Sequence, residues 1–159
     1  MKISIRKGLG FGLTSGVITT LGLIVGLSAG TNSKKIVLGG IVLIAIADSL
    51  SDALGIHISE ESGSKQTTEK EVWESTLSTV FFKFLFALTF AIPVLFFALQ
   101  TAVIIGVIWG LFLLVVFSFY IAKNRKEKPI HVILEHLIIA TLVVIATYFI
   151  GNWIATWAV

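Results

Sequence analysis

The sequence predicts an all-α membrane protein whose chain crosses the bilayer five times. Of its 159 residues 56% are hydrophobic and only 13% are charged, and the mean hydropathy is +0.98. A soluble domain with so little charge could not cover its own surface with polar groups. Five apolar stretches, each close to the ~20 residues that cross a bilayer core, make up most of the chain. Strands are disfavoured because the stretches lack a period-2 alternation.

The five predicted helices form one transmembrane domain, residues 1–159. A capping box, Thr68 with Glu71, predicts that the third helix begins near Glu69, outside the apolar run. The third and fourth crossings merge in one apolar run, residues 81–122, which is too long for a single crossing. We therefore expect a helical hairpin that turns near residues 99–101. The predicted spans are approximately 8–30, 36–58, 77–99, 101–122 and 130–156, with a cytoplasmic loop at 59–76.

Basic residues are unevenly distributed between the two sides of the predicted membrane domain. Lys34 and Lys35 fall on one side, and ten others fall on the opposite side. The positive-inside rule then predicts a cytoplasmic N-terminus and an external C-terminus in a multi-pass protein of the cell membrane, if the cell is prokaryotic. We expect Lys83 to extend its ammonium group to the inner interface. The ten are Lys2, Arg6, Lys7, Lys65, Lys70, Lys83, Lys123, Arg125, Lys126 and Lys128.

Several other classes of protein are disfavoured by the sequence. Cysteine is absent, which argues against a disulfide framework, a zinc finger or a thiol catalyst. A His-Glu-x-x-His run, a Gly-Asp aspartyl signature and a nucleotide-binding loop are absent too, so we do not expect an enzyme. The net charge of +3 flanks apolar spans and does not indicate nucleic-acid binding. A signal peptide is the less favoured interpretation of residues 9–30, which are long and glycine-rich for one.

The first predicted helix has a face of small residues. Six glycines fall within an arc of about 120° at ~100° per residue. Such a face lets another helix backbone approach closely, and we expect a homodimer formed through it. Ser15 and Thr19 lie in the same arc, so the face could also line a polar path; packing alone is the alternative. The glycines are Gly8, Gly12, Gly16, Gly22, Gly26 and Gly30, and Gly55 of the second helix is assigned the same packing role.

The second predicted helix carries two acids one turn apart. Asp48 lies near the middle of the span, and Ser51, Asp52, Gly55 and Ser59 all lie within about 60° of it around the helix. A carboxylate at that depth costs ~2.5–3.5 kcal/mol on insertion scales, so it should face a bundle interior, a partner or a water-filled cavity. His57 falls on the opposite face. The structural alternative, in which the acids are neutral, capped or paired with a base, is disfavoured because no lysine or arginine is expected at that depth.

The depths of polar groups on the two helices match. In antiparallel helices Ser15 should lie level with Asp52, and Thr19 level with Asp48, at ~1.5 Å per residue. Carboxylate and hydroxyl oxygens form a hard site that suits Mn²⁺, Mg²⁺ or Ca²⁺ and tolerates Fe²⁺. Two such close carboxylates would share a proton unless a cation neutralises them, which offers a basis for exchanging protons against a metal ion. The predicted metal ligands are Asp48 and Asp52, supported by Ser15, Thr19 and Ser51.

Two sequence stretches resemble a known family. "GLTSGVITTLGLIVGLSAG" and "ADSLSDALGIHISEE" are similar to the first two helices of the vacuolar iron transporter (VIT) family, and "FAIPVLFF" and "TYFIGNW" to its third and fifth helices. The resemblance implies five helices, a homodimer with a path between the first and second helices, and proton-coupled export of Fe²⁺ or Mn²⁺ from the cytoplasm. No tightly bound cofactor and no nucleic-acid partner are expected, only the bilayer and the transported ion.

The chain departs from the family pattern at the predicted site. The family's helix-one aspartate falls on Ser15, its helix-two methionine on Asp52 and its helix-two glutamate on Ile56. One acid has thus moved from one helix to the other, and the site is harder than the family's. The acidic segment is short, and its glutamates, with His131 and Glu135 at the start of the fifth span, form a predicted cytoplasmic entrance. The alternative is an ordinary solvated loop for the glutamates and solvated residues at a helix start for His131 and Glu135. The entrance residues are Glu60, Glu61, Glu71, Glu74, His131 and Glu135.

Two functions therefore remain from the sequence. The first is a divalent-cation exporter that uses the two aspartates. The second is a non-transporting structural or assembly membrane protein whose buried acids fix the packing of its helices.

Overall fold

The computed structural model describes residues 2–63 and 67–157. The described part of the chain is helical and contains no strand. Five segments are long and apolar enough to cross a membrane, with α3 and α4 together forming one of them. The predicted all-α class and the count of five candidate spans are confirmed. The helices are α1 (Ile3–Thr31), α2 (Lys34–Ser62), α3 (Glu69–Thr89), α4 (Ala91–Phe96), α5 (Leu99–Arg125) and α6 (Pro129–Trp157).

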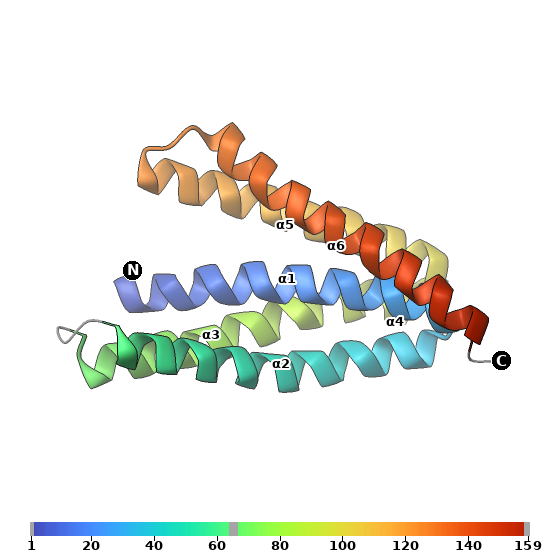
Figure 1. Ribbon diagram of the computed structural model, residues 1–159, viewed down its shortest axis with the longest axis horizontal. Coiled ribbons are helices and arrows are strands. Elements are labelled where there is room, and N and C mark those ends of the chain that lie inside the picture. Colours follow the sequence, from blue (N-terminus) through green and yellow to red (C-terminus); the bar gives the residue numbers. More distant parts are fainter. Residues whose placement is uncertain (1, 64–66, 158–159) are drawn as a thin grey trace.

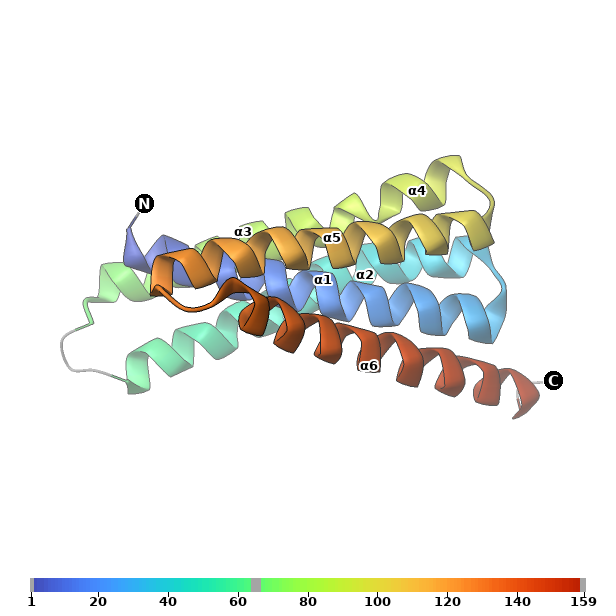
Figure 2. The same cartoon turned by 90° about the horizontal axis from the view of Figure 1, so that it is seen from above.

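Helix α1 is the centre of the bundle. It contacts α2, α3, α5 and α6. In Figure 1 it runs between the α2–α3 pair and the α5–α6 pair, and in both views the start of α1 and the end of α6 lie at opposite ends of the bundle (Figure 2). Its buried side chains, among them Val17, Leu21 and Ile24, form the apolar core together with residues of the surrounding helices. The hydroxyl groups in the middle of α1, those of Ser15, Thr19 and Thr20, are therefore held inside the bundle.

The turns between helices follow local chemistry. Thr68 and Glu71 form the predicted capping box, and α3 begins at Glu69 as predicted. Asn32 ends α1 in the left-handed conformation, with φ 46°, and its N–H donates to the Ser28 carbonyl. Ser33 then caps α2 through a hydrogen bond from the Ile36 N–H.

The third crossing is broken, which the sequence analysis did not predict. Helix α3 ends at Thr89 and the short α4 follows from Ala91. The cause is Pro93, which has no N–H to donate to the Thr89 carbonyl and whose ring would clash with it. The hairpin to the fourth crossing is confirmed, but its turn precedes Leu99, slightly earlier than the predicted 99–101.

Basic residues gather at the end of the bundle that carries the N-terminus. That end contains the start of α1, the start of α3 and the end of α5, whereas the α1–α2 turn with Lys34 and Lys35 lies at the other end (Figure 1). Most of the basic residues that the sequence assigns to one side are thus brought together, but Lys65 lies outside the described residues. Which end faces the cytoplasm stays a prediction.

The glycine face of α1 packs against helices of the same chain. Its first half lies against α3: a Cβ on Gly12 would lie 2.9 Å from the Thr79 carbonyl oxygen. Its second half lies against α6, where a Cβ on Gly26 would lie 3.3 Å from the Thr147 carbonyl oxygen. A homodimer, which stays a prediction, could not use this face without displacing α3 and α6. Around Gly55 a Cβ would meet nothing within 4 Å, so its predicted packing role has no counterpart within the described chain.

Candidate functional site

A fully buried lysine lies at the centre of the site. Only 1% of the Lys83 side chain is exposed, and it is the largest of the fully buried side chains. Its backbone packs on the glycines of α1. A Cβ on Gly12 would lie 2.9 Å from the backbone nitrogen of Lys83, and one on Gly16 would lie 3.1 Å from its carbonyl oxygen. The absence of side chains at these two positions lets α3 approach α1 closely. This close approach sets where the Lys83 side chain starts.

Lys83 pairs with both aspartates of α2. Its Nζ lies 2.5 Å from Asp48 Oδ2 and also forms an ion pair with Asp52 Oδ2. Asp48 Oδ2 has this ion pair but no hydrogen bond of regular geometry from the described residues. One ammonium group therefore bridges two carboxylates that are one helical turn apart.

The hydroxyl of Ser15 completes the cluster from α1. Ser15 Oγ donates a hydrogen bond of 2.6 Å to Asp52 Oδ2 and accepts one of 3.0 Å from Lys83 Nζ. The predicted match in depth between Ser15 and Asp52 therefore becomes a direct contact. We call Ser15, Asp48, Asp52 and Lys83 the charged cluster.

Two expectations about Lys83 are wrong. It does not extend to the interface, and a basic residue does lie at the depth of the two acids. The signal was present in the sequence, because a helix that begins at the Thr68 cap places Lys83 about 21 Å along it at ~1.5 Å per residue. The predicted third span starts at residue 77, eight residues after the helix begins at Glu69, so Lys83 was placed close to the end of the span.

The two acids are only partly covered. The Asp48 side chain is 27% exposed and the Asp52 side chain 23% exposed, on a helix whose outer face is largely apolar. With one lysine and two aspartates ionised, the cluster carries one net negative charge. A partly open, negatively charged group within an apolar bundle can attract a cation or a proton.

The other predicted ligands lie around the cluster without joining it. Thr19 Oγ1 donates to the Ser15 carbonyl oxygen of its own helix, at 2.8 Å. Ser51 is exposed on α2. Two buried hydroxyls that the sequence analysis did not single out, Thr20 Oγ1 and Ser49 Oγ, have no hydrogen-bond partner among the described residues.

His57 is held away from the charged cluster, as its helical position predicts. Its Nδ1 lies 3.0 Å from Thr76 Oγ1, and its ring packs edge-on against Trp73. Its Nε2 lies 3.4 Å from a carboxylate oxygen of Glu61. The histidine thus belongs to the contact between α2 and α3.

The acids of the predicted entrance are engaged in local contacts at the N-terminal end. Glu60 accepts two hydrogen bonds of 2.9 Å from Lys7, and Glu74 accepts one of 2.5 Å from Lys2 and one of 2.6 Å from Ser4. Glu71 caps α3. The remaining entrance residues, His131 and Glu135, are exposed at the start of α6.

The arrangement limits how an ion could be held. No group of three or more His, Cys, Asp or Glu side chains that could hold a metal ion occurs among residues 2–63 and 67–157. Two carboxylates and the Ser15 hydroxyl are the oxygen donors that the charged cluster offers. They are hard ligands, which divalent Mn²⁺ and Mg²⁺ accept.

No protein-family model matches the chain, and a search of curated proteins finds no matching sequence.

Proposed function

We propose that this protein is a divalent-cation transporter that exports Fe²⁺ or Mn²⁺ from the cytoplasm in exchange for protons, with Asp48 and Asp52 as the ion ligands. The observation that carries the proposal is the ion pair of Lys83 with both acids. A positively charged group already occupies the point between two carboxylates at which a transported cation would bind. The resemblance of residues 8–62 to the VIT family supports the same cargo.

Charge balance links ion entry to Lys83. The cluster carries two negative charges and one positive charge, so a divalent cation added beside the ammonium would leave one net positive charge in an apolar bundle. Such a charge is costly there. A divalent cation on Asp48 and Asp52 alone is neutral. We therefore expect that the ion and the Lys83 ammonium exclude each other, and that Lys83 returns when the ion leaves.

Flux through liposomes tests the acids. The purified full-length protein in liposomes should admit Mn²⁺ and move protons the opposite way, followed with dyes for each ion. Asp48→Asn and Asp52→Asn should each lower the rate about tenfold or more, because each removes half of the negative charge that binds the ion. Glu69→Gln is the matched control, since it removes one carboxylate that has no ion pair among the described residues. Normal flux in both aspartate variants would show that the acids are not the site.

Binding of Mn²⁺ tests the part assigned to Lys83. Lys83→Met removes the competing ammonium while keeping an unbranched chain, so it should tighten Mn²⁺ binding about tenfold. Calorimetry on the detergent-purified protein measures this. Unchanged binding by a folded Lys83→Met protein would contradict the competition.

The second candidate is a non-transporting structural or assembly membrane protein. It is favoured by one observation: Lys83 of α3 pairs with both aspartates of α2, and Ser15 of α1 bonds to Asp52. These contacts would hold the three helices together without any bound ion. In that case the wild type would move no Mn²⁺, and the same three variants would lower the thermal midpoint of the bundle. Flux in the wild type decides between the two candidates.

A further inference from the structure

A cavity opens between α1 and α5 at the basic end of the bundle. It has a volume of about 290 Å³ and lies between the first three turns of α1 and the last three turns of α5. Figure 1 shows α5 and α6 diverging from α1 towards this end. The cavity shares no residue with the charged cluster, and its lining residue nearest to Ser15 along α1 is Gly10, five positions earlier.

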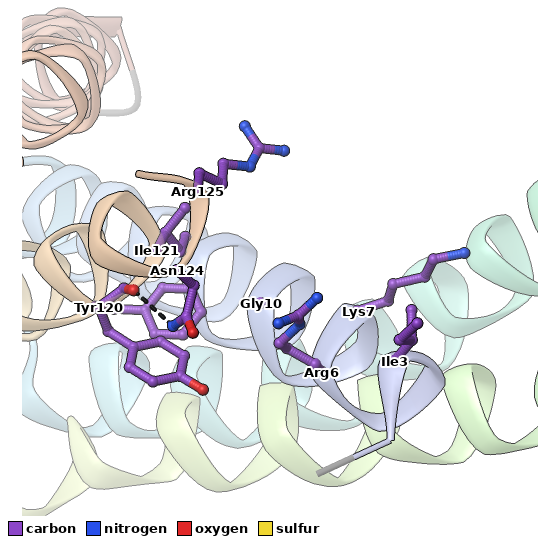
Figure 3. Close-up of a pocket in the computed structure, with 9 residues that line it drawn as sticks. Ile3, Arg6, Lys7, Gly10, Tyr120, Ile121, Asn124 and Arg125 are labelled. Atoms are coloured by element: carbon purple, nitrogen blue, oxygen red, sulfur yellow. Dashed lines mark hydrogen bonds between the residues drawn. The ribbon is translucent and has the colours of Figure 1, made fainter. Parts of the chain in front are cut away.

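The cavity has an apolar wall and a basic rim. Ile3, Phe117 and Ile121 supply the wall. Arg6 on α1, with Tyr120 and Arg125 on α5, supplies polar groups around it (Figure 3). Gly10 lines the floor, where a Cβ would lie 3.6 Å from the Phe117 ring. A ligand for such a site should be anionic at one end and apolar at the other.

The described residues compensate little of the positive charge of the two arginines at the rim. Among the described residues no carboxylate lies within 4.0 Å of Arg6, and the single carboxylate contact of Arg125 is with Glu127, at 3.9 Å. The Arg125 side chain is 70% exposed, which weakens that contact further. Lys7, by contrast, is held by Glu60. Two guanidinium groups thus remain able to bind a phosphate, for which their fork of donors is suited.

The cavity lies beside the end of the apolar stretch of α5, where we expect lipid headgroups. There the apolar part of α5 gives way to residues 123–128, all of which are charged except Asn124. Tyr120, which is 43% exposed, is the kind of amphipathic ring that is common at the boundary between acyl chains and water. Basic pockets between transmembrane helices at this level bind anionic headgroups.

We propose that this cavity binds an anionic phospholipid, with its phosphate at Arg6 and Arg125 and the upper part of an acyl chain along Ile3, Phe117 and Ile121. The phosphate is recognised by charge and by guanidinium donors. The negative net charge of the lipid selects it over a zwitterionic lipid, whose ammonium group the neighbouring lysines repel. The apolar wall selects it over a free phosphate ester.

Native mass spectrometry of the full-length protein in detergent tests the proposal. Phosphatidylglycerol should remain bound at concentrations at which phosphatidylcholine and soluble glycerol phosphate do not. The double variant Arg6→Gln/Arg125→Gln should lower phosphatidylglycerol occupancy about fivefold or more. Gly10→Leu should lower it as well, because the new side chain fills the cavity without changing the charge.

The matched control is Lys123→Gln/Lys128→Gln, which removes the same charge from the same end but changes no residue that lines the cavity. It should change occupancy less than about twofold. An equal loss in this control would overturn the proposal in favour of diffuse surface charge. Equal binding of phosphatidylcholine, equal binding of glycerol phosphate, or full occupancy in folded Gly10→Leu would also overturn it.

Discussion

Lys83 Nζ lies 2.5 Å from Asp48 Oδ2, although only 1% of the lysine side chain is exposed. The two residues come from α3 and α2, and both lie within segments apolar enough to cross a membrane. A buried ion pair is strongly destabilised when one partner is removed, because the other charge is left without compensation. The pair therefore offers a test of what holds the bundle together.

Lys83→Met should destabilise the protein by about 3 kcal/mol, because two carboxylates then lose their shared partner. Because the two carboxylates are partly exposed, we expect a loss at the lower end of the about 3–5 kcal/mol that breaking a buried ion pair costs. The triple variant Lys83→Met/Asp48→Asn/Asp52→Asn should regain most of the loss, since a neutral cluster contains no unpaired charge. Thermal unfolding in detergent, followed by circular dichroism, measures both. A triple variant no more stable than Lys83→Met would mean that the charges are not what the lysine compensates.

Gly12→Ala should destabilise the bundle by about 1–3 kcal/mol, because the added methyl group meets backbone atoms of α3 at 2.9 Å and pushes the two helices apart. Gly55→Ala is the control. Around Gly55 nothing lies within 4 Å, so the change should leave stability unaltered or raise it by up to about 1 kcal/mol through helix propensity. Denaturant unfolding of both variants gives the comparison. A similar loss at Gly55 would point to a contact outside this chain.

Thr68→Ala should weaken the start of α3 by about 1 kcal/mol, because the capping box loses its side-chain acceptor for the Glu71 N–H. Glu71→Gln keeps a capping-box residue and should cost much less. Hydrogen exchange of the first turn of α3 should accelerate in the first variant only. Equal hydrogen-exchange protection of this turn in both variants would show that the Thr68 cap does not limit the local opening of α3.

Lys34→Met should loosen the end of α4. Lys34 Nζ donates hydrogen bonds of 3.0 Å and 3.1 Å to the carbonyl oxygens of Leu95 and Phe97, which lie at the C-terminal end of α4, where backbone carbonyls lack partners within the helix. Because the lysine is exposed, we expect a loss of only about 1 kcal/mol. Lys35→Met removes the same charge from the same turn without those bonds. Faster hydrogen exchange at residues 95–98 in the Lys34 variant alone would agree with this role.

The orientation is open to direct labelling because the chain has no cysteine. In right-side-out membrane vesicles, a membrane-impermeant thiol reagent should label Ser33→Cys and should not label Glu127→Cys, in keeping with the charge asymmetry. Permeabilisation should expose both positions. The reverse pattern would show that the N-terminus lies outside.

The number of candidate membrane spans and the capping box could be predicted because they depend on local properties. Hydropathy averaged over one stretch predicts a span whatever the stretch packs against, and Thr68 and Glu71 act within a single turn. The depth match between Ser15 and Asp52 was also predictable. In two antiparallel helices joined by a short turn, the number of residues from the turn gives the relative depth of each group. In contrast, the break before Pro93 was missed because a proline near a span end can be tolerated or can break the helix.

The partner of the two acids was decided by the tertiary structure. Lys83 is separated from Asp52 by 31 positions and from Ser15 by 68. The sequence supplied the acids, the hydroxyl and the glycines, but pairing a buried lysine with them requires α3 to lie against both α1 and α2. That approach is permitted by Gly12 and Gly16 and completed by charge attraction in an apolar surrounding, where an uncompensated charge has no water to stabilise it.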